Sequence, residues 1–392
     1  MKKLKLLVAA MFMAIALGLP AKAVFAATIT LTQADFTFAD CNGTANAKGI
    51  ICSEVGGENA YQLPDGEFTL GENISLGTGT AFTTGDSFSL DLNGKTISTN
   101  NNTYSALELD GKSAIISGTG NITNTGFGRG VAAYGEYDTS NNLVARTKLT
   151  INGNPNISSI GVRGTELTIN GGTFAGSGWV SAVDFGDDSI TVINGGTFSA
   201  EGADAVYVFG GSLTVNGGTF TSAGSIGLML EGQLNSLKIT GGTFTGKTAG
   251  LAMGFIPIST SLSGGTFTTT GSDEWDLGPI QVSNDDVTEN TLNSFLAAGA
   301  SYSDGSFHLN STVTPKQAYL TTKSVTITNG STPAPADDST STNSSSTVGT
   351  PNSGRSTAEA GSVTSSLAGL IASIVLVSLA FLGKKHFAKK SA

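Results

Sequence analysis

Three acidic residues lie close together near the middle of the chain, at Asp184, Asp187 and Asp188. Paired carboxylates can hydrolyse a glycosidic bond by acid and base catalysis. Grouped carboxylates can also bind calcium. The simpler interpretation is a solvated turn, because a glycine precedes the pair Asp187 and Asp188 and turns are rich in Gly and Asp. A calcium site and a catalytic site are therefore alternatives to a plain acidic turn.

Residues 186–188 read Gly-Asp-Asp and resemble the GDD element of the polygalacturonase family, in which paired acids serve as general acid and as base for the attacking water. That family also needs NTD, HG and RIK elements. None occurs here: residues 124–126 read NTG, and the histidines are His308 and His386. A polysaccharide lyase would combine calcium ligands with an Arg or Lys base, but Arg163 is the only basic residue between positions 149 and 237. We therefore expect no catalytic residues and keep a polysaccharide lyase or hydrolase as an alternative.

Aromatic side chains offer a different kind of site. A sugar-binding face stacks exposed rings on the sugar and uses acids and amides to bond its hydroxyls. The aromatic candidates are Trp179, Tyr207, Trp275, Tyr134 and Tyr137. If the Ala-Val pairs at 182–183 and 205–206 are equivalent, Asp184 and Tyr207 occupy matching positions. The candidate ligand-binding residues are therefore Trp179, Asp184, Tyr207 and Trp275.

A repeated motif must position these residues. The stretch INGGTF occurs at 169–174 and 193–198, and it returns as VNGGTF at 215–220, ITGGTF at 239–244 and LSGGTF at 262–267. The spacings of 24, 22, 24 and 23 residues indicate a stacked solenoid. With 53 glycines and frequent Thr, Val and Ile, the repeat is a β repeat rather than a helical one.

Each period contains two strand-like pieces: an alternating piece before the Gly-Gly pair and a short apolar piece after it. Weaker copies extend backward, which predicts about eight coils over 88–285, with residues 137–148 as an inserted loop. Equivalent residues of stacked coils lie over one another, about 4.8 Å apart. This predicts an internal stack of Phe174, Phe198, Phe220, Phe244 and Phe267. It also predicts a polar ladder at the turn, formed by Asn170, Asn194, Asn216, Thr240 and Ser263.

The LxLNGxxI and GGTF motifs resemble those of the right-handed parallel β-helix, the fold of pectate-lyase-like proteins and of many bacterial surface proteins. The resemblance covers roughly residues 65–330. It implies an all-β solenoid, with the β-helix at 65–285, and it implies no particular activity.

Both ends of such a solenoid need covering, because they expose unpaired strands. Residues 27–64 are the expected N-terminal cap, and residues 286–330 are the expected C-terminal cap. The chain has two cysteines, Cys41 and Cys52, and both lie in the first cap. In an exported protein this pair predicts a disulfide.

The chain ends predict export and anchoring. Residues 1–26 combine lysines, an apolar run and small residues, as a signal peptide does. A Ser/Thr-rich linker at 331–366 precedes an apolar segment at 367–383 and a basic tail at 384–392, which predicts a membrane segment with a cytoplasmic end. Within the linker, Thr350, Pro351, Asn352, Ser353 and Gly354 resemble an LPXTG-type sorting signal, although Thr350 and Ser353 depart from it. The resemblance implies cleavage by a sortase after Ser353 and attachment to the cell wall.

The expected mature segment 27–353 keeps 11 of the 20 basic residues and 29 of the 30 acidic residues, so its net charge is −18. Such a surface repels nucleic acid and suits solubility or divalent cations such as calcium. We therefore expect an extracellular, surface-anchored and non-catalytic adhesin or glycan-binding protein that contacts glycans or the surface of a host or neighbouring cell. The alternatives are the polysaccharide-degrading enzyme and a passive stalk or coat protein.

Overall fold

The structure, a computed structural model, describes residues 28–38, 41–83, 85–177, 181, 183–272 and 278–329. Contacts divide the chain into the units Met1–Pro333 and Ala334–Ala392, and every described residue belongs to the first. The expected signal peptide, linker with its sorting motif, membrane segment and basic tail lie outside the described residues. Within the described part, no helix has the length and apolar character needed to span a bilayer.

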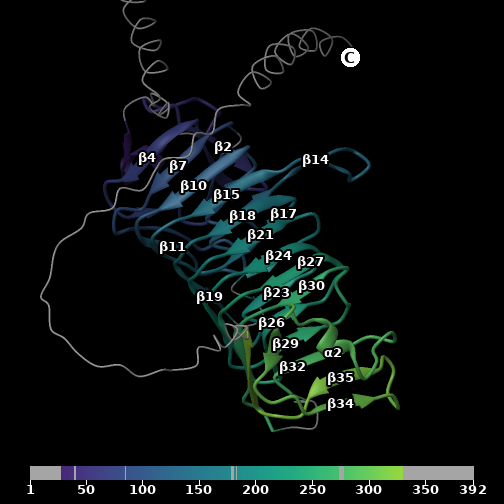
Figure 1. Ribbon diagram of the computed structural model, residues 1–392. Coiled ribbons are helices and arrows are strands. Elements are labelled where there is room, and N and C mark those ends of the chain that lie inside the picture. Colours follow the sequence, from purple (N-terminus) through teal and green to yellow (C-terminus); the bar gives the residue numbers. More distant parts are fainter. Residues whose placement is uncertain are drawn as a thin grey trace, which may run out of the picture. The chain divides into compact units, whose positions relative to one another are not determined.

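Three long sheets form the body of the molecule (Figure 1). Sheet A consists, in spatial order, of β1 (Ile29–Leu31), β4 (Gly66–Leu70), β7 (Phe88–Asp91), β10 (Ser113–Ser117), β15 (Thr147–Ile151), β18 (Thr165–Ile169), β21 (Ile190–Ile193), β24 (Gly211–Val215), β27 (Leu234–Ile239) and β30 (Thr260–Leu262). Sheet B consists of β2 (Ile51–Val55), β3 (Glu58–Leu63), β6 (Thr80–Thr83), β9 (Leu107–Leu109), β12 (Val131–Tyr134), β17 (Ile160–Arg163), β20 (Val183–Phe185), β23 (Val206–Val208), β26 (Ile226–Leu230), β29 (Ala249–Met253), β32 (Ile280–Ser283), β35 (Gln317–Leu320) and β34 (Phe307–Asn310). Sheet C consists of β33 (Ala300–Tyr302), β36 (Ser324–Asn329), β31 (Gly265–Thr269), β28 (Thr243–Gly246), β25 (Thr219–Ser222), β22 (Thr197–Ala200), β19 (Thr173–Gly176), β16 (Asn154–Ile157), β11 (Thr119–Asn124), β8 (Lys95–Thr99) and β5 (Ile74–Ser75).

The chain winds through these sheets as a parallel β-solenoid of about eight turns, which confirms the predicted fold class. A turn passes through sheet A, then sheet C, then sheet B, as β18, β19 and β20 do. Each turn thus has three strands where the sequence predicted two. The four-residue Thr-Phe piece after the glycines was too short to read as a strand, but in the structure it pairs with its copies in the neighbouring turns.

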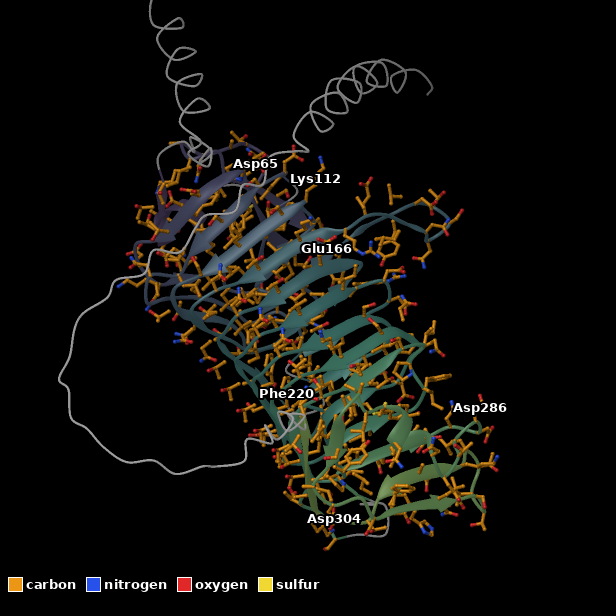
Figure 2. The ribbon with its side chains drawn as sticks, viewed as in Figure 1. Asp65, Lys112, Glu166, Phe220, Asp286 and Asp304 are labelled. Atoms are coloured by element: carbon orange, nitrogen blue, oxygen red, sulfur yellow. A yellow bond between two sulfur atoms is a disulfide. The ribbon has the colours of Figure 1, made fainter. Side chains whose placement is uncertain are left out.

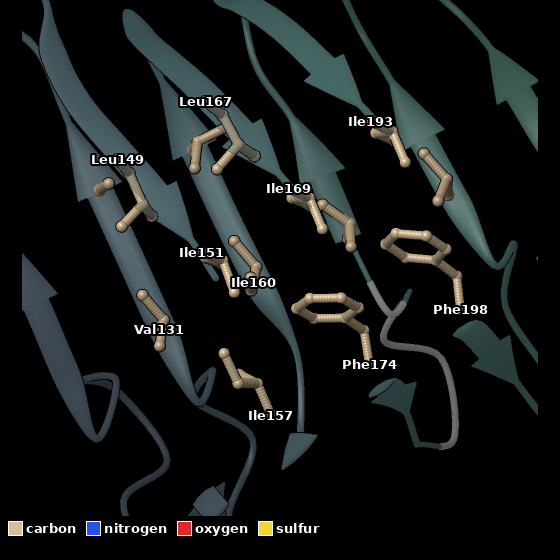
Figure 3. Packing of buried hydrophobic residues seen from close by; sticks show 14 of the residues in the cluster. Val131, Leu149, Ile151, Ile157, Ile160, Leu167, Ile169, Phe174, Ile193 and Phe198 are labelled. Carbon is tan, nitrogen blue, oxygen red and sulfur yellow. The ribbon is translucent and has the colours of Figure 1, made fainter. Parts of the chain in front are cut away.

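The phenylalanines of the GGTF motif form the predicted internal stack. Successive rings from Phe174 to Phe267 have centroids 4.9, 4.7, 4.5 and 4.7 Å apart, and their planes lie within 10° of parallel. All five side chains are fully buried. In the preceding turn Ile157 takes the same place, in register with Phe174 and beside it in the core (Figure 3). The core is therefore built of columns that run along the solenoid.

The Gly-Gly turn between sheets A and C carries the predicted polar ladder. The second glycine of each pair has a positive φ, as Gly218 does at 108°, which a side chain would strongly disfavour. The amide of each asparagine donates to the one in the turn before it, with distances of 2.8 Å (Asn170 to Asn152), 2.7 Å (Asn194 to Asn170) and 2.8 Å (Asn216 to Asn194). Thr240 continues the ladder, whereas the Ser263 hydroxyl donates instead to a backbone carbonyl. The ladder thus starts one turn earlier than predicted and ends one turn earlier.

Short elements cover the two ends of the solenoid. At the N-terminal end, η1 (Gln33–Phe36) presents Gln33, whose side-chain amide bonds both the N–H and the C=O of Ser75 on the edge strand β5. A disulfide joins Cys41 to Cys52 there, with 4.7 Å between their Cα atoms. At the C-terminal end, β35 and β36 pair antiparallel with β32 and β31, and α2 (Thr291–Ser294) precedes a segment that bonds to Leu262 of β30. Backbone groups of β5, β30, β31 and β32 that could otherwise pair with another chain are thereby bonded.

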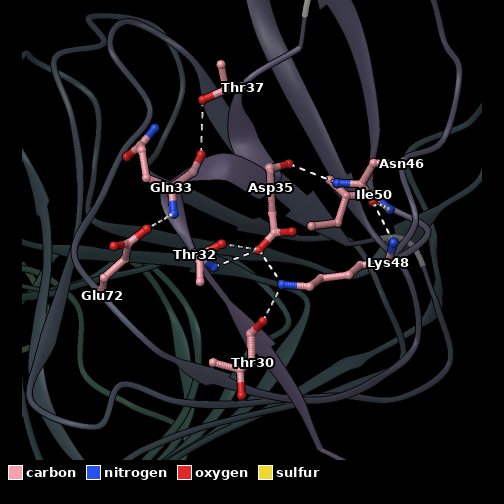
Figure 4. A network of polar contacts seen from close by, with 9 residues as sticks. All are labelled: Thr30, Thr32, Gln33, Asp35, Thr37, Asn46, Lys48, Ile50 and Glu72. Atoms are coloured by element: carbon pink, nitrogen blue, oxygen red, sulfur yellow. Dashed lines mark hydrogen bonds and ion pairs between the residues drawn. The ribbon is translucent and has the colours of Figure 1, made fainter.

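An ion pair in the N-terminal cap predicts a loss of stability in acid. The Asp35 carboxylate accepts hydrogen bonds from Lys48 Nζ (2.6 Å) and from the backbone N–H of Thr32 (2.7 Å) (Figure 4). Burial alone would raise the pKa of Asp35, but these hydrogen bonds outweigh it and hold that pKa below its ordinary value of 3.8. Since the folded-state pKa is depressed, the stabilisation is present above that ordinary value and is lost as the pH falls below it.

We therefore expect Asp35→Asn to lower the free energy of unfolding by about 1 kcal/mol at neutral pH, because a charge-assisted hydrogen bond becomes a neutral one. Denaturant unfolding at neutral pH and near pH 3 measures this. The difference between wild type and variant should shrink at the lower pH, and a difference that stays constant would show that Asp35 is not the titrating group.

Candidate functional site

The outward face of sheet B varies from turn to turn and contains the candidate site. Positions that alternate with core residues form one column in register along this face: Gln62, Phe82, Glu108, Ala132, Gly161, Asp184, Tyr207, Met229, Ala252 and Gln281. Gly161 and Tyr207 lie in this column on either side of Asp184. Both line a hollow in the outward face.

This first hollow has a volume of about 580 Å³. Its lining comes from β12, β17 and β23 and from the loops around them: Arg129, Tyr134, Gly161, Val162, Ser181, Gly186, Gly202, Ala203, Asp204, Tyr207, Phe209 and Ser225. Two of its aromatic rings are well exposed, at 42% for Tyr134 and 48% for Phe209. Among its described residues the hollow thus combines aromatic rings with one cation, one carboxylate and the hydroxyls of two serines and two tyrosines.

Arg129 lies across the floor of the hollow. A Cβ atom added to Gly161 would come within 2.0 Å of Arg129 Nε, so the arginine side chain occupies the space that any other residue at 161 would fill. Glycine at this position is therefore what allows a cation from the preceding turn to lie on the sheet. The guanidinium is a planar donor suited to carboxylates and hydroxyls.

Partly buried carboxyl groups lie at the hollow and beside it. The Asp204 carboxylate accepts hydrogen bonds from Ser225 Oγ (2.6 Å) and from the backbone N–H of Ile226 (3.1 Å). Burial raises the pKa of Asp204 by more than these two hydrogen bonds lower it. Beside Tyr134, burial raises the pKa of Glu108, and the nearby Asp110 carboxylate adds to the rise. These acids are thus easier to protonate than exposed ones and can serve as hydrogen-bond partners for hydroxyl groups.

The structure brings only some of the sequence candidates to this hollow. Tyr207 lines it, and the Cα register pairs Asp184 with Tyr207, as the alignment of the Ala-Val pairs predicted. The side chain of Asp184 and all of Trp179 and Trp275 lie outside the described residues. Tyr134 also lines the hollow, whereas Tyr137 packs under Arg163, whose guanidinium carbon is 4.3 Å from the ring centroid.

The acidic segment after β20 forms an exposed turn. Asp187 and Asp188 are both exposed, and Asp188 has a φ of 59°. Their backbone carbonyls accept hydrogen bonds from the Gly164 N–H (3.0 Å) and from Arg146 Nε (3.0 Å). No three His, Cys, Asp or Glu side chains of the described residues are grouped to hold a metal ion. Because the Asp184 side chain lies outside that set, calcium at Asp184, Asp187 and Asp188 stays a prediction.

Arg129, Ser181 and Asp204 were missed by the sequence analysis. Each lies two positions before the first core residue of its sheet B strand, namely Val131, Val183 and Val206. Aligning the repeats on these valines would have shown that this position changes from Arg to Ser to Asp between turns. An aromatic candidate can be recognised by its residue type, whereas this position can be recognised only by the register of the strands.

No family model, curated protein or solved structure matches this chain. The case for a function therefore rests on the geometry of the first hollow.

Proposed function

We propose that this chain is a non-catalytic glycan-binding protein, displayed outside a cell as an adhesin. The first hollow is the observation that carries the proposal, because it places Tyr134, Tyr207 and Phe209 around polar groups. A sugar has apolar C–H faces that stack on rings and hydroxyl edges that need hydrogen bonds. The hollow offers both kinds of contact on an exposed face of the solenoid.

The dimensions and polar groups of the hollow also suit a sugar. Its volume of about 580 Å³ lies within the usual range of small-molecule sites. Arg129 supplies donors, and the Asp204 carboxylate supplies acceptor capacity beyond its two bonds to Ser225 and Ile226. The hydroxyls of a neutral sugar, or the carboxylate of an acidic one, would accept hydrogen bonds from Arg129, and sugar hydroxyls would donate to Asp204.

Display at a cell surface is supported by the ends of the chain and by the cap. The Cys41–Cys52 disulfide fits an oxidising compartment outside the cytoplasm. The signal peptide at 1–26, the sorting signal at 350–354 and the apolar segment at 367–383 would take the protein to a bacterial cell wall through a sortase, or leave it in the membrane. The pectate-lyase-like resemblance is consistent with a polysaccharide ligand. A calcium ion could bridge that polysaccharide to Asp187 and Asp188 of the acidic turn.

One observation favours the enzymatic alternative. From the sequence, Arg163 was the only basic residue between positions 149 and 237. In the structure Arg129 supplies a second basic side chain, in the same hollow as Asp204. An arginine next to a carboxylate can equally bind a sugar, so turnover has to be measured directly. The stalk alternative rests on the regular GGTF turns, which lie in the same solenoid as the hollow.

The proposal predicts the effect of Tyr207→Ala. Loss of this ring should weaken glycan binding about tenfold, because stacking and the apolar contact together contribute about 1.4 kcal/mol. The variant should fold normally, since Tyr207 lies on the outward face. Calorimetric titration with the tightest-binding glycan gives the dissociation constants.

Tyr319→Ala is the matched control. Tyr319 is a partly exposed tyrosine paired with Gln281 at the end of the same outward column, and it does not line the first hollow. Binding should be unchanged in this variant. Equal losses in both variants, or no loss in Tyr207→Ala, would place the glycan elsewhere and refute the proposed site.

A further inference from the structure

The outward face of sheet C carries two ranks of side chains that run along the solenoid (Figure 1). They lie on either side of the buried phenylalanine stack, because residues that alternate with core residues point outward. The first rank consists, in register, of Thr96, Asn121, Asn156, Thr173, Thr197, Thr219, Thr243, Thr266 and Thr326. The second rank contains Ala175, Ser199, Thr221, Thr245, Thr268 and Ser324. Threonine predominates, and neither set includes a charged or aromatic residue.

This lack of charge distinguishes sheet C from the rest of the solenoid. The expected mature segment 27–353 has a net charge of −18. The outward face of sheet A carries the ion pair of Lys148 with Glu166, whose N and O atoms are 3.1 Å apart; Figure 2 labels Glu166. The outward column of sheet B contains Glu108 and Asp184. Sheet C is therefore the face that suits a neutral ligand.

The ranks extend beyond the GGTF repeat. The strand β36 belongs to the C-terminal cap, runs antiparallel to β31 and lacks the motif, yet it places Thr326 beside Thr266 and Ser324 beside Thr268. The two pairs of hydroxyl oxygens are 3.1 and 3.0 Å apart. A strand from outside the repeat thus continues the same surface, which indicates a role for the surface itself and not only for the core beneath it.

The threonines form a flat and regular lattice. The phenylalanine rings beneath them are 4.5–4.9 Å apart and within 10° of parallel, whereas neighbouring strands of most sheets are rotated by about 20–25°. Each rank therefore repeats at the strand spacing, and the two ranks are about 6.6 Å apart along a strand. The β-branched side chain of threonine has few rotamers, so its hydroxyl and methyl groups keep this spacing.

The hydroxyls at the centre of this lattice are available to a ligand. Thr197, Thr219 and Thr243 are exposed, and their hydroxyls make no hydrogen bond to another described residue. Each hydroxyl can donate to water and accept from it, while the methyl group beside it restricts where that water lies. The lattice thus imposes its own repeat on the first layer of water.

We propose that this threonine face binds ice. Ice is a neutral lattice of water molecules, and its oxygen atoms repeat along one crystal axis at nearly the spacing of β-strands. Water held by the two ranks fits that lattice, so the protein adsorbs to a crystal and slows its growth. The first hollow lies on sheet B, so the proposal holds whether or not that hollow binds a glycan.

The size of the face argues against a second copy of the chain as its ligand. Six strands, from β19 to β36, give a strip about 30 Å long and two side chains wide, which is roughly 400 Å². One partner in a standard protein interface buries about 800 Å². An ice crystal needs no second folded surface and can contact the whole strip.

Slow growth of ice from a dilute solution of the full chain tests the proposal, because a growing crystal excludes solutes that do not bind to it. The concentration of the protein in the ice, relative to the liquid, should exceed that of serum albumin about tenfold. Uptake equal to that of albumin would overturn the proposal. A dimer detected by light scattering, without uptake into ice, would show that the face is an interface between copies.

Variants locate the binding face. Thr219→Lys should lower uptake about tenfold, because the new charge has to lose water at the centre of the lattice. Thr168→Lys, on the outward face of sheet A, is the matched control and should have no effect, and neither should Tyr207→Ala in the first hollow. Circular dichroism checks that each variant is folded. Undiminished uptake in folded Thr219→Lys, or an equal loss in Thr168→Lys, would contradict binding through sheet C.

Discussion

Replacing Phe220 with alanine is expected to lower the free energy of unfolding by about 3–5 kcal/mol. Phe220 is fully buried, and its ring lies 4.7 Å from Phe198 and 4.5 Å from Phe244. The substitution removes a large apolar side chain and leaves a cavity between two rings that cannot close, because the backbone spacing is fixed by the sheets. Equilibrium unfolding in denaturant, followed by circular dichroism, measures the loss.

Two further variants separate stacking from burial. Phe220→Leu keeps an apolar side chain but loses the ring, and should cost about 1–2 kcal/mol. Thr221→Ala changes the next residue, which is exposed on the outside of β25, and should change stability by less than about 0.5 kcal/mol. If Phe220→Ala cost no more than Thr221→Ala, the stack would not stabilise the solenoid.

Loss of the disulfide is expected to have the second largest effect. Cys41 and Cys52 are 11 residues apart, and closing a loop of this size stabilises a fold by roughly 3 kcal/mol. Cys41→Ser removes the bond but leaves the buried Cys52 in the core as a small apolar residue. The cap formed by β2 and β3 should then open more often.

Amide hydrogen exchange measures this opening, because it reports local stability segment by segment. Exchange should accelerate in Ile51–Val55 and Glu58–Leu63 and stay unchanged around Phe220, since each turn of a solenoid contacts mainly its neighbours. Wild type in a reducing buffer should match the variant. Unchanged exchange in β2 and β3 would mean that the cap does not depend on the disulfide.

The sequence predicted the columns of the fold well because they depend on residue type and spacing. The nearly constant interval between GGTF motifs places Phe198 next to Phe220 in the stack, and the same interval aligns Asn194 with Asn216. The third strand of each turn was missed because a strand of four residues has no distinct periodicity. Only its pairing with copies above and below reveals it.

The candidate site was less predictable because it depends on strand register and loop length. Gly161 comes from a turn without the GGTF motif, and only the register shows which residues lie beside it in the outward column. Arg129 crosses Gly161 from a loop whose length differs from those of other turns. Tyr207 was identified because an aromatic residue in a regular turn can be aligned from the sequence alone.

Binding of the full chain to a broad panel of host and microbial glycans, with and without calcium, tests the central claim most directly. The proposed function predicts selective binding to a small set of related glycans, which are recovered uncleaved. Binding to none of them, under either condition, would contradict a glycan-binding function. Recovery of cleaved glycans would contradict the non-catalytic assignment and favour the lyase or hydrolase.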